Sequence, residues 1–258
     1  MRATSLSAVL CTLAAFSARA DDLTFTGYAR TLDTGALLYV ESHAVTDADS
    51  AQERRVVLYR CTPGSPPFAR KLLEYGASRT APAFDFDDAR SGFAEGLKRD
   101  SRGLTVFARA GARAPLRSEA LRSGGTLVAD AGFDEFVRER WDTLERGEAL
   151  KIPFVVPSLQ ERVNFRLRKV EEATIAGDVA SVIRLSLAGP LGWFLSDIDV
   201  SYRKSDRRLL RYRGLTNIRD AAGELLAAQI DFPDAERRGG TVDLAALRAL
   251  PLVSDCAR

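Results

Sequence analysis

The sequence predicts a mainly β, α+β fold: a strongly curved antiparallel sheet, or half-barrel, with one long mid-chain helix packed on its concave face and a short C-terminal helix. Three observations predict it. Apolar and polar residues alternate with period two in many short segments, turns rich in Gly, Pro, Asp and Ser separate these segments, and one helical apolar stripe occurs in mid-chain. Alternation buries one face of each strand, as an antiparallel sheet with one solvated face requires. Consecutive hairpins then form a meander.

The strands are predicted where the alternation occurs. It is strictest at residues 163–167, 183–187 and 198–202, where apolar residues alternate with Arg, Asn, Asp and Ser. Less regular strands are predicted at residues 23–29, 36–42, 54–60, 68–75, 103–109 and 225–232. Turn sequences such as Asp33-Thr34-Gly35 separate consecutive strands. Residues 47–52 and 109–125 are predicted to be loops.

The long helix is predicted from apolar residues that recur at helical spacing. They fall at positions i, i+3, i+4, i+8 and i+11 of one stripe: Phe133, Phe136, Val137, Trp141 and Leu144. Asp134 and Glu135 suit the first turn of this helix, and Gly147 supplies its stop. The short helix is predicted at residues 243–250, where leucines at 244, 247 and 250 share one side and Pro251 ends it.

The first twenty residues are typical of a secretory signal peptide. Arg2 supplies the positive region, residues 6–16 are an apolar run, and the run is followed by a small-x-small cleavage pattern that ends at Ala20. The expected domains are therefore a signal peptide at residues 1–20 and a single β-rich periplasmic domain at residues 21–258. Lipidation of Cys11 is the alternative, but Leu10 is large where that signal needs a small residue. No later apolar run reaches membrane-spanning length, so no membrane span is expected in the mature chain.

Two cysteines remain after the expected cleavage. Cys61 and Cys256 form an even pair in an oxidising compartment, which predicts one disulfide that closes most of the chain into a loop. Two independent thiols are the alternative.

The charge of the chain gives no reason to expect nucleic acid as a partner. Loss of Arg2 and Arg19 with the signal peptide would leave equal numbers of basic and acidic residues, 35 of each. Arginines do recur on the polar faces of the late strands, for example at Arg166, Arg184 and Arg211. They could form a basic strip for phosphate or carboxylate groups, but the acidic residues nearby favour a salt-bridged surface.

Few residues suggest catalysis. The chain has one histidine, His43, and it lacks a nucleophile elbow, a Walker loop and a dinucleotide-binding loop, so no metal and no cofactor are expected. Asp85, Asp87 and Asp88 lie in an alternating segment that places Asp85 and Asp87 on the face opposite the phenylalanines. Paired carboxylates can act as acid and base in a cleft, although such residues on an exposed strand face are ordinarily solvated.

Aromatic residues give the candidate ligand-binding site. The residues that could line a pocket between the helix and the curved sheet are Phe133, Phe136, Trp141, Trp193 and Phe194. Packing in the core is the alternative use of this stripe. The last two residues belong to a Gly- and Pro-containing connection at residues 189–194, which could move over the mouth of a groove or form a packed turn.

The segment at residues 198–232 resembles the late hairpins of LolA/LolB-type periplasmic proteins. It consists of a strand, a turn at residues 204–206, a second strand, a turn containing Gly223, and a final strand. The chain also resembles secreted proteins of Gram-negative bacteria. The resemblance implies an open half-barrel that holds a hydrophobic ligand such as an acyl chain. The expected function is thus a non-catalytic periplasmic carrier of a lipid or acyl chain. The alternatives are an envelope assembly factor that binds a protein partner and a hydrolase that uses Asp85, Asp87 and Asp88.

Overall fold

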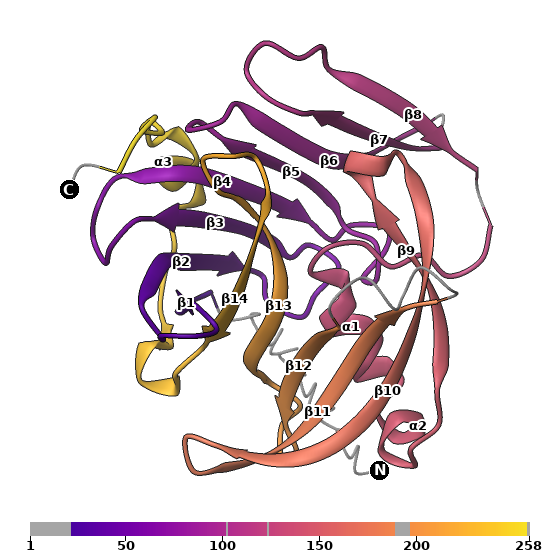
Figure 1. The fold of residues 1–258 in the computed structure, drawn as a ribbon. Coiled ribbons are helices and arrows are strands. Elements are labelled where there is room, and N and C mark those ends of the chain that lie inside the picture. The colour runs from indigo at the N-terminus through magenta and orange to yellow at the C-terminus, as the bar shows by residue number, and fades with distance from the viewer. Residues whose placement is uncertain (1–21, 102, 123, 189–196, 257–258) are drawn as a thin grey trace, which may run out of the picture.

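A single antiparallel sheet of 15 strands organises the chain (Figure 1). The computed structural model describes residues 22–101, 103–122, 124–188 and 197–256, so the predicted signal peptide and its cleavage site lie outside the described residues. The sheet is strongly curved and does not close into a barrel, because β8 and β9 stand at its two edges. This arrangement confirms the predicted half-barrel.

Two meanders make up the sheet, and they are joined where the first and last long strands meet. The first meander comprises β1 (Leu23–Arg30), β2 (Leu37–Thr46), β3 (Arg54–Arg60), β4 (Pro67–Glu74), β5 (Ala83–Asp88), β6 (Phe93–Asp100), β7 (Gly103–Arg109) and β8 (Arg117–Leu121). The second comprises β9 (Leu150–Val156), β10 (Glu161–Ile175), β11 (Asp178–Leu187), β12 (Ile198–Arg203), β13 (Leu209–Arg219) and β14 (Leu225–Asp231). β1 pairs with β14 in the register Ala29 to Ile230, and the short β15 (Arg238–Gly239) also pairs with β1.

The predicted strands are present, and the structure adds strands that alternation does not reveal. The loop predicted at residues 109–125 is wrong in part, because it contains β8. This strand is exposed except at Leu121, and its only strand partner among the described residues is β7, so edge pairing forms it without an alternating pattern. β9 was also not predicted, because Pro153 interrupts its pattern. An edge strand tolerates this proline, which has no N–H to donate to a ladder.

The predicted long helix is present as two consecutive helices, α1 (Gly132–Glu139) and α2 (Trp141–Glu145), divided at Arg140. Its apolar stripe continues through both and is buried, as predicted. The stripe packs against side chains of β9 to β12 and forms the second core with them: Ile152, Leu167, Ile183, Leu185, Val200 and Tyr202. Gly147 has a φ of 79°, a left-handed conformation that suits glycine and ends the helical segment.

The first meander has its own core, which is rich in aromatic residues. The Tyr59 ring lies 6.0 Å from Tyr39, 6.5 Å from Phe68 and 5.5 Å from Phe86, centroid to centroid. This cluster also receives Ile230 from β14, so it extends across the join between the meanders.

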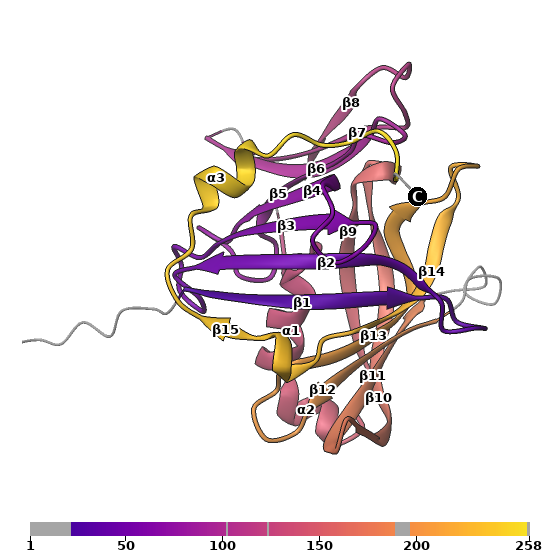
Figure 2. The ribbon, with the colours of Figure 1, turned by 90° about the vertical axis from the view of Figure 1, so that its left-hand side faces the viewer.

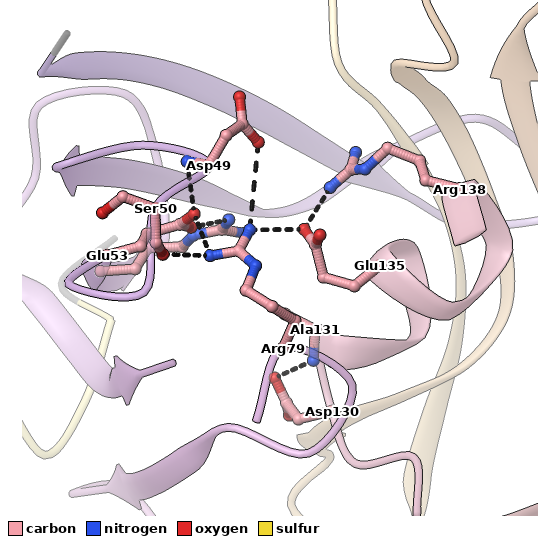
Figure 3. A network of polar contacts seen from close by, with 9 residues as sticks. Asp49, Ser50, Glu53, Arg79, Asp130, Ala131, Glu135 and Arg138 are labelled. Carbon is pink, nitrogen blue, oxygen red and sulfur yellow. Dashed lines mark hydrogen bonds and ion pairs between the residues drawn. The ribbon is translucent and has the colours of Figure 1, made fainter. Parts of the chain in front are cut away.

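Helix α1 is tied to the first meander by charged groups (Figure 3). The guanidinium of Arg79, in the β4–β5 connection, lies 3.0 Å from Glu53 before β3 and 2.9 Å from Glu135 on α1. Arg138 also pairs with Glu135, at 2.6 Å. The helix therefore packs its apolar stripe on the second meander and is joined to the first through Glu135. It also has a polar contact with the second meander, where the Tyr202 hydroxyl donates to Asp134 at 2.6 Å.

A close backbone contact fixes the start of α1. Val128 bonds to both Pro153 and Val155 of the edge strand β9, and the N–H of Ala129 donates to the carbonyl of Thr80 at 2.9 Å. A Cβ at Gly132 would lie 2.1 Å from that same carbonyl oxygen. Only glycine fits where the helix begins.

The C-terminal segment packs on the side of the first meander away from α1 (Figure 2). Helix α3 (Leu244–Ala249) is capped by the Asp243 side chain, which accepts from the N–H of Ala246 at 2.9 Å and confirms the predicted short helix. Arg70 of β4 donates to the carbonyls of Arg248 and Leu250. Beyond it, Cys256 is bonded to Cys61 at the end of β3, with the two Cα atoms 5.8 Å apart, which confirms the predicted disulfide.

Trp141→Ala should lower the free energy of unfolding by about 3–5 kcal/mol, because it removes a large side chain that is only 6% exposed. Chemical denaturation of both proteins measures the change. Leu116→Ala is the control, because Leu116 is 59% exposed and its loss should cost less than about 0.5 kcal/mol. A loss below about 1 kcal/mol for Trp141→Ala would contradict a core position.

Gly132→Ala should lower the melting temperature, because the added methyl collides with the Thr80 carbonyl. Gly239→Ala is the matched control, since a Cβ there meets no atom within 4 Å. Equal melting temperatures for the two variants would show that α1 does not approach Thr80 this closely.

Candidate functional site

A cavity of about 840 Å³ lies between the two meanders and α1. Residues from β1 to β6, from β9 to β14 and from α1 line it. Binding pockets for small ligands have volumes of roughly 300–1,000 Å³, so this space is large enough for a lipid-sized molecule.

The part of the cavity wall that β9 to β12 provide is apolar. It consists of side chains from neighbouring strands on one face of the sheet: Phe154, Val163, Phe165, Leu185, Leu187, Ile198 and Val200. The Phe154 ring lies 5.9 Å from Phe165 and 6.5 Å from Phe133 on α1. Strict alternation along β10, β11 and β12 places these residues on the inner face.

The two ends of the cavity differ in character. One end is lined by Leu159 and Leu225, which are 59% and 41% exposed. Exposed leucines that also line a cavity indicate an apolar opening to solvent. The other end carries charged side chains from the β2–β3 connection and from the segments flanking β13 and β14: Asp49, Asp206, Arg208, Asp234 and Arg237.

The wall that the first meander provides carries a polar row. Register places Phe25, His43, Val57, Lys71, Phe86 and Glu95 opposite one another on consecutive strands from β1 to β6. His43, Lys71 and Glu95 therefore alternate with apolar residues across the inner face, on every second strand. Neighbouring strands are about 4.8 Å apart, so each polar residue lies roughly 10 Å from the next.

Lys71 is the central residue of this row. Its ammonium donates to Asp130, immediately before α1, at 2.6 Å, and both side chains are 10% exposed or less. Burial alone would lower the pKa of Lys71, but the carboxylates of Asp130, Glu41 and Glu95 outweigh it and raise this pKa. Lys71 therefore stays charged inside the cavity wall.

His43 is stacked on Phe25, with ring centroids 4.3 Å apart, and its Nε2 lies 3.0 Å from a carboxylate oxygen of Glu41. Burial lowers the pKa of His43, and Glu41 only partly offsets this effect. The imidazole is therefore neutral at pH 7. Since the carboxylate accepts from Nε2, the other ring nitrogen, Nδ1, carries a lone pair.

Glu95 is 7% exposed and accepts a hydrogen bond from the side-chain amide of Asn217 at 3.1 Å. Burial raises the pKa of Glu95 to about 6, with Asp130 adding to the effect and Lys71 opposing it. Above this pH the carboxyl group of Glu95 is mostly ionised, and its burial makes the ionised form unfavourable.

The structure brings together only part of the predicted aromatic site. Phe133 lines the cavity, whereas Phe136 and Trp141 are buried in the second core, with Trp141 edge-on to Tyr202 at 6.4 Å. Trp193 and Phe194 lie outside the described residues. The prediction that Trp193 and Phe194 line the cavity therefore stays a prediction.

The three candidate catalytic carboxylates do not line the cavity. Asp88 is 1% exposed and bonds to Arg90 at 2.7 Å, and Asp87 lies 3.6 Å from Arg109. Asp85 is on the face of β5 opposite Phe84, which does line the cavity. Likewise, Arg184 of the predicted basic strip is held by Asp199 through two hydrogen bonds, at 2.7 and 2.8 Å.

Sequence reasoning missed the polar row, although a signal for it exists. Glu41, Lys71 and Glu95 each occur in phase with apolar residues of the same strand, such as Tyr39, Leu73 and Phe93. A charged residue in phase with the apolar face of a strand points into the interior. An interpretation that assigns every charged residue of a strand to the outer face overlooks these three.

No protein-family model matches the chain, and no curated protein sequence matches it. Solved structures do. A β-barrel-like protein of the domain of unknown function DUF1849 from Brucella abortus superposes with a TM-score of 0.50 at 7% identity, covering 86% of this chain and 99% of its own. This match shows that the chain shares that fold.

Two further structures superpose more loosely. A DUF1329 family protein from Desulfovibrio piger gives a TM-score of 0.28 at 11% identity, covering 86% of this chain and 87% of its own. An outer membrane lipoprotein-sorting protein domain from Vibrio parahaemolyticus gives 0.29 at 10% identity, covering 86% of each chain. Within the described residues, no helix has both the length and the apolar character needed to cross a membrane.

Glu95→Gln should become more stable relative to the wild type as the pH rises from 4.5 to 7.5. Because the pKa of Glu95 in the folded protein is about 6, against an ordinary 4.5, the wild type loses stability over this range as the buried carboxyl ionises. The shift corresponds to about 2 kcal/mol. Urea denaturation at both pH values measures it, with the exposed Glu119→Gln on β8 as the control. A pH-independent difference for Glu95→Gln would contradict the burial of an ionisable group there.

Proposed function

We propose that the protein is a non-catalytic periplasmic carrier that binds a hydrophobic ligand, a lipid or acyl chain, in the cavity between its meanders. The exported chain would begin after residue 20, as the signal pattern predicts. The ligand's apolar part lies along the wall of β9 to β12, where Phe154, Phe165 and Ile198 contact it.

One observation carries this proposal: a large cavity with an apolar wall ends at exposed leucines. Each methylene that moves from water into such a wall contributes about 0.8 kcal/mol. A chain of ten or more methylenes therefore supplies ample free energy for binding, even after the cost of immobilising the ligand. The opening at Leu159 and Leu225 gives the chain a route in.

Filling the cavity should weaken binding. Val163→Trp places an indole among Phe154, Phe165 and Leu187 on the apolar wall, and it should weaken binding of a neutral fluorescent probe, N-phenyl-1-naphthylamine, by roughly tenfold or more. Val179→Trp is the matched control, because the same substitution is made at a β11 residue that is 53% exposed and outside the cavity. The measurement is a fluorescence titration of each variant.

Saturable binding to the wild type and to Val179→Trp, together with binding to Val163→Trp that is weaker by roughly tenfold or more, supports the carrier. Probe binding that is equal in all three proteins contradicts a ligand site in the cavity. Extraction of the purified protein with organic solvent, followed by mass spectrometry, should then yield a co-purifying lipid. An empty extract together with a stable protein partner would favour the envelope assembly factor instead.

A further inference from the structure

We infer that the cavity's ligand is an amphiphile whose polar end is a non-anionic hydrogen-bond donor, a hydroxyl or an amine, seated on the row of His43, Lys71 and Glu95. The inference rests on the proposed function and adds the chemistry of the ligand's head group. It follows from where the buried polar groups lie, how their charges are balanced and which of their atoms lack partners.

The row and the most apolar part of the cavity lie on different walls. His43, Lys71 and Glu95 face the cavity from β2, β4 and β6, while the facing wall of β9 to β12 is apolar. A purely apolar ligand would leave this row in contact with hydrocarbon, which is costly for polar groups. A ligand with one polar end and one apolar side matches both walls.

Acceptors outnumber cations along the row. Glu41, Asp130 and Glu95 surround the single ammonium of Lys71, and Asp130 already holds that ammonium at 2.6 Å. The nearby guanidinium of Arg55 is paired with Glu53 at 2.7 Å. Arg219 of β13 also lines the cavity, with its guanidinium 4.3 Å from the centre of the Phe93 ring, so one further cation lies near the row. A carboxylate or phosphate head group seated on the row would still meet the carboxylates of Glu41, Asp130 and Glu95, whereas a hydroxyl or amine would donate to them.

Three buried atoms of this wall also lack a partner within the described part of the chain: Nδ1 of His43, the hydroxyl of Tyr39 and Nε of Arg55. All three residues line the cavity, and Tyr39 is 1% exposed. Nδ1 of the neutral imidazole needs a donor, since Nε2 is already engaged by Glu41. The tyrosine hydroxyl can both donate and accept. A ligand hydroxyl satisfies both kinds of site.

A rival placement exists at the charged end of the cavity. Arg237 lines it, with its guanidinium 5.5 Å from the centre of the Phe25 ring. An anionic head group would seek this residue and would leave the polar row empty. The experiment therefore compares ligands that differ only in the head group.

The test is displacement of N-phenyl-1-naphthylamine from the wild-type protein at pH 8 by 1-dodecanol, dodecylamine and dodecanoate, the alcohol below its solubility limit and the other two below their critical micelle concentrations. We expect the alcohol and the amine to displace the probe at concentrations at least about tenfold lower than dodecanoate does, since like charges at a buried site are strongly unfavourable. Equal or stronger displacement by dodecanoate overturns the inference, as does displacement by none of the three. Failure of the probe itself to bind would instead contradict the proposed function.

Variants locate the discrimination. Glu41→Gln combined with Glu95→Gln should reduce the preference for the alcohol and amine over dodecanoate by roughly tenfold, because it removes two of the carboxylates that repel an anion. Glu119→Gln and Arg237→Gln should leave the preference unchanged. If Arg237→Gln is the variant that alters the ranking, the head group lies at the charged end and the inference is wrong.

Discussion

Helix α1 is the element on which the rest of the arrangement depends, because the sheet is open and something must hold its two meanders face to face. The apolar stripe of the helix is buried against β9 to β12, while Arg79 joins its Glu135 to Glu53 of the first meander (Figure 3). These contacts differ in kind. Burial of the stripe supplies most of the free energy, whereas the ion pairs fix direction, since partly exposed ion pairs contribute little stability on their own. Gly132 lets the helix start directly against Thr80, which sets how near the first meander comes.

Helix α1 occupies only part of the space on the concave side of the sheet, and the remaining space is the cavity. The wall of this cavity carries polar side chains that would be unusual in a packed apolar core. A buried ion pair such as Lys71–Asp130 is often no more stable than an apolar pair of the same size. Glu95 also lowers the stability of the folded protein when it is ionised, because its raised pKa of about 6 results from burial. A sheet selected for stability alone would carry leucine or valine at these positions. Polar residues at them are therefore evidence for recognition, which links the row on β2, β4 and β6 to the proposed ligand.

The sequence predicts most of this fold and little of its site, for one physical reason. Period-two alternation in segments such as Ile198 to Tyr202 reports which face is buried, and the helical stripe from Phe133 to Leu144 reports a buried helix face, so both elements were predictable. Alternation does not report whether a buried face is packed or hollow, which depends on how two meanders distant in sequence are placed. Phe136 and Trp141 hence belong to the core although they share a stripe with the cavity residue Phe133. The edge strands β8 and β9 form through pairing and tolerate sequences, including Pro153, that alternation would exclude.

In the proposed carrier, the two walls of the cavity would have different tasks. The apolar wall contributes affinity in proportion to chain length, about 0.8 kcal/mol for each methylene, and it cannot distinguish one acyl chain from another of equal length. The polar row contributes little to affinity, because every hydrogen bond with the ligand replaces one with water. We expect the row to discriminate between ligands, since a head group that leaves Nδ1 of His43 or a carboxylate unpaired incurs the full cost of a buried polar atom. Leu159 and Leu225 at the open end have no polar side-chain atoms that a ligand must pair with. We therefore expect that the apolar chain of a ligand can pass this opening whichever head group the row selects.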